Sequence, residues 1–382
     1  MTNITRARVA GSLVALATFT TFAALAGCKG GCPWGKEPAA APRPGPSLTI
    51  GAGRPVDPLP GETRLRNVRQ LTFGGENAEA YWSNDGTRLI LQRTLPPSIP
   101  ADQIFTLDLR SGDERMVSTG KGRTTCAYFL QGDQDIVFAS THFANDAPPP
   151  AVRVVKGRYV WPIFDTYEIW RAKANGSGLT RLTDTPGYDA EATVDPVSGR
   201  LVFTSMRDGE LEVYTMAPDG SDVRRVTNRV GYDGGAFFSH DGKRLVLRSG
   251  FLKDDKETED YRTLLAQGLV MPSRMEITIC NADGSGFRQV TDNGKANFAP
   301  YFHPDDRHIV FSSNMADAQG RDFDIWLIHD DGSGLEQVTH NPTFDGFPMF
   351  SPDGKFLVFA SNRYGKERGG TNIFVAEWVE EP

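Results

Sequence analysis

The chain has 382 residues, of which 39% are hydrophobic and only four are cysteine. Acidic residues outnumber basic ones by 48 to 41, which gives a net charge of -7. Nucleic-acid binding requires clustered positive charge, so this balance argues against a nucleic-acid partner. The composition also excludes a polytopic membrane protein and a long coiled coil, and the cysteines are too few for a disulfide scaffold.

Residues 1–27 have the pattern of an export signal. Arg6 and Arg8 precede an apolar run from Val9 to Ala26, and the run ends in Leu25-Ala26-Gly27-Cys28. A charged start, an apolar stretch and small residues before a cleavage point are typical of a secretory signal peptide. The alternative is an uncleaved transmembrane helix, but hydroxylated residues dilute the stretch of about 20 strongly apolar residues that such a helix needs.

The tetrapeptide that ends at Cys28 resembles the bacterial lipobox. This resemblance implies cleavage before Cys28 and lipidation of Cys28, and several acyl chains make a stable anchor. We therefore expect a lipoprotein of the bacterial cell envelope that faces the periplasm and contacts the membrane through its lipid only. Lys29 follows the cysteine in place of the aspartate that retains many lipoproteins in the inner membrane, which favours the outer membrane.

Residues 28–62 are expected to form a tether behind the lipidated cysteine. Eight prolines lie between residues 29 and 62, and no hydrophobic period appears there. Such a segment cannot offset the entropy lost on ordering, so it predicts an extended linker. Cys32 is expected to be an incidental thiol. The folded domain is expected to span residues 63–382.

From residue 63 onward, a unit of about 45 residues recurs six times and carries two long insertions. Each unit combines an aromatic residue, an Asp-Gly type turn and a short apolar strand, followed by two further strands around a second turn. The first turns include Tyr81–Gly86, Phe237–Gly242, Tyr301–Asp306 and Met349–Gly354, and the last strands close on Arg181-Leu182-Thr183, Arg225-Val226-Thr227, Gln289-Val290-Thr291 or Gln337-Val338-Thr339. This period, with strands and no helical spacing, predicts an all-β fold, a six-bladed β-propeller.

These repeated phrases resemble the WD40-like repeats of the TolB-type β-propeller family, and the resemblance covers residues 66–378. The Gly-His and Trp-Asp pairs of true WD40 repeats are absent. The resemblance implies contacts in the periplasm with lipoproteins and peptidoglycan-linked complexes. TolB proteins have an α/β domain before the propeller, and this chain has the proline-rich segment in that place.

The two ends of the repeat region are complementary. The last unit stops after a third strand at residues 372–378, whereas residues 66–72 form a fourth strand with no blade before it. We therefore expect the N-terminal strand, at about 66–72, to close the last blade together with three C-terminal strands. This closure would leave no exposed sheet edge at the junction.

Both long insertions fall between the second and third strands of their units, at Thr141–Thr166 and Gly250–Arg274. Loops of this length are usually functional or disordered, and the aromatic residues Tyr159, Trp161 and Phe164 argue against disorder. We expect the insertions to cap one face of the ring, although they could instead only cover hydrophobic flanks.

The candidate ligand-binding residues lie on that same face. A polar residue recurs near the start of each innermost strand, and we call these six residues the polar column. Two acidic residues lie two positions after a column residue, and further polar residues end the second strands. The column is Asn77, Thr124, Asp189, Asp233, Asn297 and Asp345, and the others are Glu79, Glu191, Arg93, His142, Arg207, Arg248, Asn314, Asn362 and Arg363. Arginines opposite carboxylates suit a polar or anionic ligand, and they equally suit ion pairs between blades. Asn and Asp also cap turns.

The sequence lacks the motifs of common enzyme classes. It contains no nucleophile elbow, no dinucleotide fingerprint and no phosphate loop, so we assign no catalytic residue, no cofactor and no metal. Cys126 and Cys280 are expected to be small buried residues. The topology predicts His142 and His340 on the capped face, and it predicts His240, His303, His308 and His329 near the opposite, turn-bearing face.

Two functions remain open. The first is a monomeric, lipid-anchored scaffold or binding module for envelope proteins or a polar or anionic small ligand. The alternative is a periplasmic polysaccharide lyase or hydrolase that acts in the capped pocket through His142, Arg207 and either Asp189 or Glu191. The repeats also resemble those of oligogalacturonate lyases, which implies a histidine-rich manganese site, and only His142 stands in a comparable place.

Overall fold

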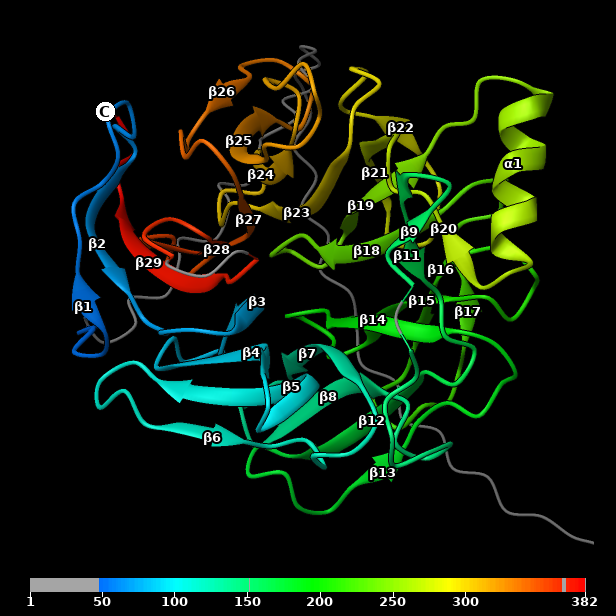
Figure 1. The fold of residues 1–382 in the computed structure, drawn as a ribbon, viewed down its shortest axis with the longest axis horizontal. Helices are drawn as coiled ribbons and strands as arrows, with labels where there is room; N and C mark the ends of the chain where they lie inside the picture. Colours follow the sequence, from blue (N-terminus) through cyan, green and yellow to red (C-terminus); the bar gives the residue numbers. More distant parts are fainter. Residues whose placement is uncertain (1–47, 151, 366–368, 382) are drawn as a thin grey trace, which may run out of the picture. The chain divides into compact units, whose positions relative to one another are not determined.

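The structure is a computed structural model that describes residues 48–150, 152–365 and 369–381. The predicted signal peptide, the lipidation site Cys28, and Cys32 lie outside these residues. In the described part, six large antiparallel sheets surround a central axis (Figure 1). This arrangement confirms the all-β class and the six-bladed propeller.

Five blades have four strands, and the sixth has five. From the inner strand outward, blade one contains β3 (Glu76–Trp82), β4 (Arg88–Leu95), β5 (Ile99–Asp108) and β6 (Glu114–Met116), and blade two contains β7 (Thr124–Phe129), β8 (Asp135–Ser140), β12 (Glu168–Lys173) and β13 (Thr180–Arg181). Blade three contains β14 (Asp189–Val194), β15 (Leu201–Ser205), β16 (Glu212–Met216) and β17 (Arg224–Arg225), and blade four contains β18 (Asp233–Phe238), β19 (Arg244–Gly250), β21 (Met275–Asn281) and β22 (Arg288–Gln289). Blade five contains β23 (Asn297–Phe302), β24 (His308–Ser313), β25 (Asp324–His329) and β26 (Glu336–Gln337), and blade six contains β27 (Asp345–Phe350), β28 (Phe356–Ser361), β29 (Asn372–Trp378), β2 (Leu65–Gln70) and β1 (Arg54–Pro55).

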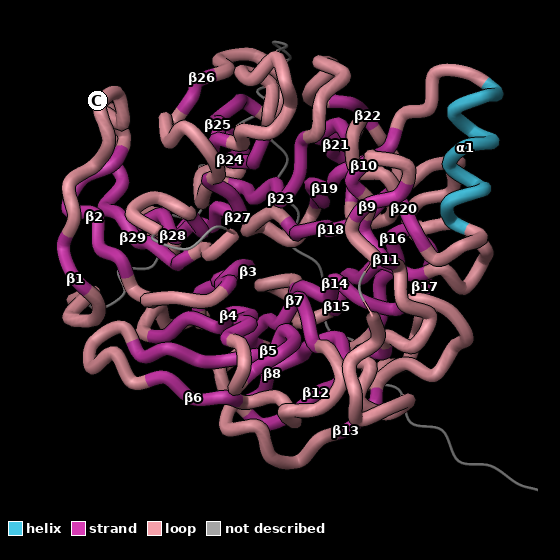
Figure 2. The backbone as a smooth tube through the Cα atoms, in the orientation of Figure 1, coloured by secondary structure: helices cyan, strands magenta, loops and turns pink. Residues whose placement is uncertain are grey.

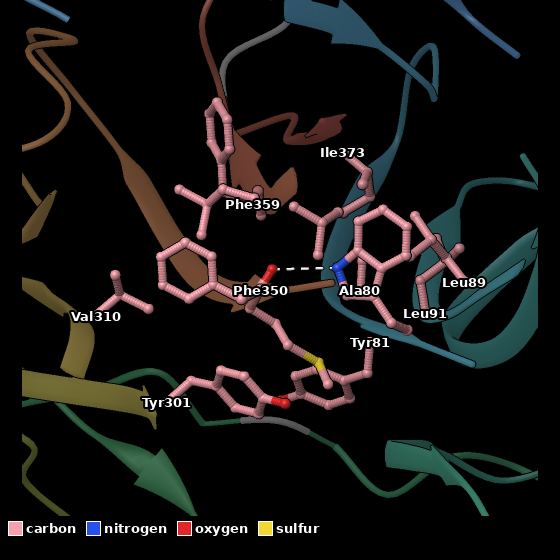
Figure 3. Close-up of a cluster of buried hydrophobic side chains, with 14 of the residues drawn as sticks. Ala80, Tyr81, Leu89, Leu91, Tyr301, Val310, Phe350, Phe359 and Ile373 are labelled. Atoms are coloured by element: carbon pink, nitrogen blue, oxygen red, sulfur yellow. Dashed lines mark hydrogen bonds between the residues drawn. The ribbon is translucent and has the colours of Figure 1, made fainter. Parts of the chain in front are cut away.

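The second strand of a blade is covered by neighbouring blades on both faces. Every residue of β8 and of β15 is buried, which explains why these strands read as continuous apolar runs rather than alternating ones. Figure 3 shows one such interface, where Leu89 and Leu91 of blade one lie on the same side of blade six as Ile373. Burial of each such side chain stabilises the fold by about 1.5–3 kcal/mol.

A buried hydroxyl near the end of the outer strand explains the repeated closing threonine. In blade three, the Oγ1 of Thr227 accepts a hydrogen bond from the backbone N–H of Val213 at 2.9 Å and donates one to the carboxylate of Glu212. The same pairing joins Ser118 to Gln103, Thr183 to Glu168, Thr291 to Glu276, Thr339 to Asp324 and Thr72 to Asn372. The hydroxyl thus satisfies buried polar groups in all six blades.

The N-terminal strand closes the ring as expected. Strand β2 pairs antiparallel with β29, with Leu65 opposite Trp378 and Gln70 opposite Phe374. Val68 is fully buried at this seam. Blade six also gains an outer strand, β1, that the sequence did not predict.

Residues 48–62 belong to the folded domain, which corrects the predicted boundary at residue 63. The backbone N–H groups of Gly51 and Ala52 both donate to the carbonyl of Leu109, at 2.9 and 3.0 Å. Glu62 is buried against Arg363. The backbone hydrogen bonds and this ion pair offset the conformational entropy that the proline-rich segment loses when it becomes ordered. Of the predicted tether, only residues up to 47 lie outside the described part.

The two insertions join into one cover, which we call the lid. The first contains β9 (Val154–Val155), β10 (Arg158–Tyr159) and β11 (Trp161–Pro162), and the second contains β20 (Leu269–Val270). Strand β11 pairs with β20, so the lid links blades two and four in front of blade three (Figure 1). The insertions therefore do cap one face.

The second insertion also contains α1 (Asp255–Leu265), the single helix of the described residues (Figure 2). The expectation of no helical spacing was wrong for this segment. The carboxylate of Asp254 caps the helix by accepting from the N–H of Glu257 at 2.8 Å, and Tyr261 and Leu265, four residues apart, are its buried side chains. In the described ranges, no helix combines the length and apolar character needed to cross a membrane.

Candidate ligand-binding site

Each inner strand is interrupted by a β-bulge at the same point of the repeat. The bulge residue has a positive φ although five of the six are not glycine, and the sheet register shifts around it. The residues are Glu79 (50°), Cys126 (49°), Glu191 (60°), Gly235 (58°), Ala299 (49°) and Phe347 (55°). Bulges re-aim side chains, and strained backbone of this kind gathers at functional sites. We call these six residues the bulge ring.

The bulge ring lines a cavity of about 1330 Å³. Its floor is aromatic: the rings of Phe237 and Tyr81, which line the cavity, lie 5.6 Å apart. They pack on Tyr301, 5.4 Å from Phe237, and on Tyr128, 5.7 Å from Tyr81. These four rings come from four blades, so they meet across the propeller axis. The lid contributes Trp161 and other residues to the cavity wall. The cavity is therefore bounded by the aromatic floor, the blades and the lid.

Glu191 forms a fully bonded ion pair inside the cavity. Its carboxylate pairs with Arg248 and accepts hydrogen bonds from Thr204 Oγ1 (2.6 Å), the Tyr232 hydroxyl (2.9 Å) and the N–H of Gly235 (2.9 Å). Burial alone would raise the pKa of Glu191, but Arg248 and these donors hold it below its usual value. Glu191 is therefore an anion whose donors are already supplied by the protein.

Arg248 connects this ion pair to the lid. Its guanidinium lies 4.6 Å from the ring centroid of Tyr232 and 5.4 Å from that of Trp161. Cation–π contacts of this kind hold an aromatic side chain over a buried cation. The pair therefore stabilises the lid as well as the cavity wall.

Glu79, the other acid of the bulge ring, has no such partners. Its Oε2 is buried and makes no hydrogen bond. Burial is the main reason that the pKa of Glu79 rises from 4.5 to about 7, and the nearby Glu191 adds to the rise. The adjacent Cys126 is a free thiol whose pKa is also raised by burial, which keeps it protonated and unreactive at neutral pH. Glu79 is thus an acid of the cavity with a buried, unsatisfied carboxylate oxygen.

The raised pKa of Glu79 predicts a pH-dependent stability that the variant E79Q removes. The folded state binds this proton more tightly than the unfolded state, so stability falls as the pH rises from 4.5 to about 7. Relative to wild type, we expect E79Q to gain up to about 3 kcal/mol between pH 4.5 and pH 8, measured by urea unfolding. E191Q should instead destabilise the protein at neutral pH, because it deprives Arg248 of its partner. Parallel pH profiles for E79Q and wild type would contradict the assignment.

The opposite side of the cavity is aromatic. Phe298 and Phe347 lie 5.4 Å apart, Phe298 and Phe323 lie 5.1 Å apart, and Phe344 and Phe347 lie 6.2 Å apart, measured between ring centroids. All four rings line the cavity and come from blades five and six or the segments beside them. The cavity therefore has a polar wall on blades one to four and an aromatic wall on blades five and six.

The structure separates the predicted site residues into two groups. Glu79, Glu191, Arg248 and Asn314 line the cavity. The others do not, and they are Asn77, Thr124, Arg93, His142, Asp189, Arg207, Asp233, Asn297, Asp345, Asn362 and Arg363. Of these, the residues of the polar column are buried and hydrogen-bonded to other groups of the protein. For example, Arg93 Nε donates to Asn77 Oδ1 at 2.6 Å, and Arg207 Nη2 donates to Asp189 at 3.1 Å. They serve the structural role that was the alternative to ligand contact.

The groups assigned to the lyase or hydrolase alternative are not brought together. His142 packs on Trp170 with ring centroids 4.4 Å apart, its Nδ1 lies 2.7 Å from Ser140 Oγ, and burial lowers its pKa. Arg207 and Asp189 pair with each other outside the cavity, whereas Glu191 lines the cavity.

Several cavity residues escaped the sequence analysis. Cys126, Gly235, Ala299 and Phe347 complete the bulge ring, and Cys126 is half-buried in the cavity wall rather than a core residue like Cys280. All four lie two residues after a residue of the polar column, and the sequence analysis considered that position only for Glu79 and Glu191.

Comparison with known proteins adds to this geometry. No protein-family model and no curated protein matches the sequence. A structure described as TolB from Agrobacterium tumefaciens aligns with a TM-score of 0.53 and 19% identity, over 80% of this chain and 91% of that one. The chain has the fold of a TolB-type β-propeller.

TolB from Acinetobacter baumannii aligns with a TM-score of 0.51 and 16% identity, and the alignment covers 70% of this chain and 55% of that one. An oligogalacturonate lyase in complex with manganese aligns with a TM-score of 0.48 and 14% identity, over 87% of this chain and 99% of that one. At these identities, the two TolB structures establish the fold alone.

Proposed function

We propose that this protein is a binding or scaffold module of the bacterial cell envelope, and that its lid-covered cavity receives the ligand or a segment of the partner. The supporting observation is the cavity itself, a space of about 1330 Å³ with one aromatic wall and one polar wall. Concave, mostly apolar pockets with a few convergent polar groups are the usual form of a ligand site.

The lining predicts the chemistry of the ligand. The guanidinium of Arg248 is already paired with Glu191, so a simple anion would have to compete with that carboxylate. Glu79 can donate or accept near neutral pH, and Phe298, Phe323 and Phe347 offer apolar contact. A matching ligand has an apolar body and a polar group that reaches Glu79. A side chain or chain end of an envelope protein has this chemistry, as does a small polar molecule.

The proposed location depends on residues 1–28. Export, lipidation at Cys28 and a periplasm-facing position at the outer membrane complete the proposal, and in this setting the protein acts as a monomer. The lyase or hydrolase alternative gains no support within the described part of the chain, where the groups assigned to it do not meet.

Filling the cavity should abolish binding. Ala299 lies in the bulge ring with φ 49°, and the same repeat position in blade six is Phe347 with φ 55°, so A299F places a side chain that this backbone already accepts. Full-length wild type and A299F are immobilised and exposed to an envelope extract, and retained proteins and small molecules are identified by mass spectrometry. We expect A299F to retain the bound species at least 10-fold less than wild type.

The matched control is A299S, which changes the same position with little added volume and should bind as wild type does. Urea unfolding checks that both variants are folded. Retention of the same species by A299F and wild type would show that the cavity is not the binding site.

A further inference from the structure

We propose that His303, Asp305 and His308 form a binding site for a divalent transition metal of the zinc class, on the turn-bearing face of blade five. The three residues lie in and beside the turn between β23 and β24. One donor atom from each lies within 4.8 Å of the other two. The site is independent of the cavity and of the proposed function.

The donor set suits a metal, and its atoms lie close together. His303 Nδ1 lies 3.2 Å from Asp305 Oδ1, and His308 Nδ1 lies 2.6 Å from Asp305 Oδ2. Two imidazole nitrogens and a carboxylate are a common ligand set for Zn²⁺, with bonds of about 2.0–2.2 Å and an open fourth position for water. The side chains of Asp305 and His308 are each 34% exposed, so an ion can enter from solvent.

The repeat shows that the turn itself needs no histidine. In blades one, four and six, the residue that corresponds to His303 is a serine whose Oγ donates to the turn aspartate, at 2.7, 2.6 and 2.7 Å. The residue that corresponds to His308 is Arg88 in blade one and Arg244 in blade four. Blade five replaces both positions at once and places two imidazoles around one carboxylate.

The surroundings of His303 provide a second observation. The residue is 8% exposed, its Nε2 makes no hydrogen bond, and Glu380 Oε1 lies 3.3 Å from that nitrogen. The backbone N–H of Asp305 lies 3.3 Å from His303 Nδ1 and donates to it, so a neutral imidazole carries its proton on Nε2 and directs the lone pair of Nδ1 toward the Asp305 carboxylate. A metal on Nδ1 keeps the proton on Nε2, where it can donate to Glu380. Metal-bound histidines are commonly oriented by such a carboxylate.

The test uses full-length protein stripped with a chelator and titrated with ZnCl₂ by calorimetry, and with CoCl₂ by visible absorption. We expect wild type to bind one equivalent at this site and to give the absorption of a nitrogen- and oxygen-ligated Co²⁺. The variant H303S/H308R installs the residues of blades one and four, so its turn should fold, and we expect its zinc affinity at this site to fall at least 100-fold. The single variants H303S and H308R are measured as well, in case the double variant is unstable.

The control is H240N, which removes a histidine from the same face by installing the residue of blade one, Asn84, and should leave zinc binding unchanged. Failure of wild type to bind zinc would overturn the proposal. Equal binding by wild type and by H303S, H308R and the double variant would overturn it too, because the metal would then lie elsewhere.

Discussion

Replacing Arg363 by methionine is expected to lower the free energy of unfolding by about 3–5 kcal/mol. The Arg363 side chain is 1% exposed and lies between two fully buried carboxylates. It donates to Glu62 at 2.7 and 2.9 Å and to Asp345 at 2.6 Å. Its loss leaves both carboxylates buried without their cation, which is the costly way to break a buried ion pair. Urea unfolding at neutral pH measures the loss.

The protein contains a matched control for this prediction in blade three. Arg207 has the same local contacts, since its backbone N–H and Nε bond Ser205 Oγ as those of Arg363 bond Ser361 Oγ, but it pairs with Asp189 alone and is 15% exposed. We expect R207M to lose less than half as much stability as R363M. Equal losses would contradict the role assigned to Glu62 and the docking of residues 48–62.

Deletion of residues 66–72 is expected to lower the melting temperature by about 10 °C or more, measured by differential scanning calorimetry. The deletion removes most of β2, with the buried side chain of Val68, and the buried Leu71 that follows the strand. Each of these contributes about 1.5–3 kcal/mol. It also removes the closing hydroxyl of Thr72 and exposes the edge of β29.

Deletion of residues 48–56 provides the control. It removes β1, whose two residues are exposed, together with the small buried residue Ala52, and leaves β2 and Glu62 in place. We expect this variant to melt much closer to wild type than the first. If deletion of 66–72 leaves the melting temperature unchanged, the closed ring is not what stabilises the propeller.

The propeller could be predicted because its signals are local and repeated. The strand expected at residues 372–378 is β29, residue for residue, and the incomplete last unit pointed to closure by the first strand. The missed features depend on distant partners. Glu62 finds Arg363 301 positions away along the chain, and nothing near Glu62 announces that contact.

Helix α1 was missed for a different reason. Asp254-x-x-Glu257 followed by Tyr261 and Leu265 is a recognisable helix start with an apolar stripe, but it lies inside an insertion that does not follow the repeat. A search for the repeat of about 45 residues finds the blades but does not find a short helix inside an insertion.

The candidate site was predicted only in part, because the backbone decides which side chains enter the cavity. The polar column is consumed by hydrogen bonds within the blades, and the residue two positions on reaches the cavity through a bulge with positive φ. Glu79 and Glu191 attracted notice by their charge. Ala299 and Phe347 occupy the same position of the repeat but are uncharged, and glycine is the main residue type that indicates a backbone with positive φ in a sequence.

The pairing of β11 with β20 also constrains how this ring can evolve. Propellers gain and lose blades by duplication and deletion of single units. Here one half of the lid belongs to the second unit and its complement belongs to the fourth. A change in the number of units between them would separate the two strands, so the lid over the cavity depends on the present number of units.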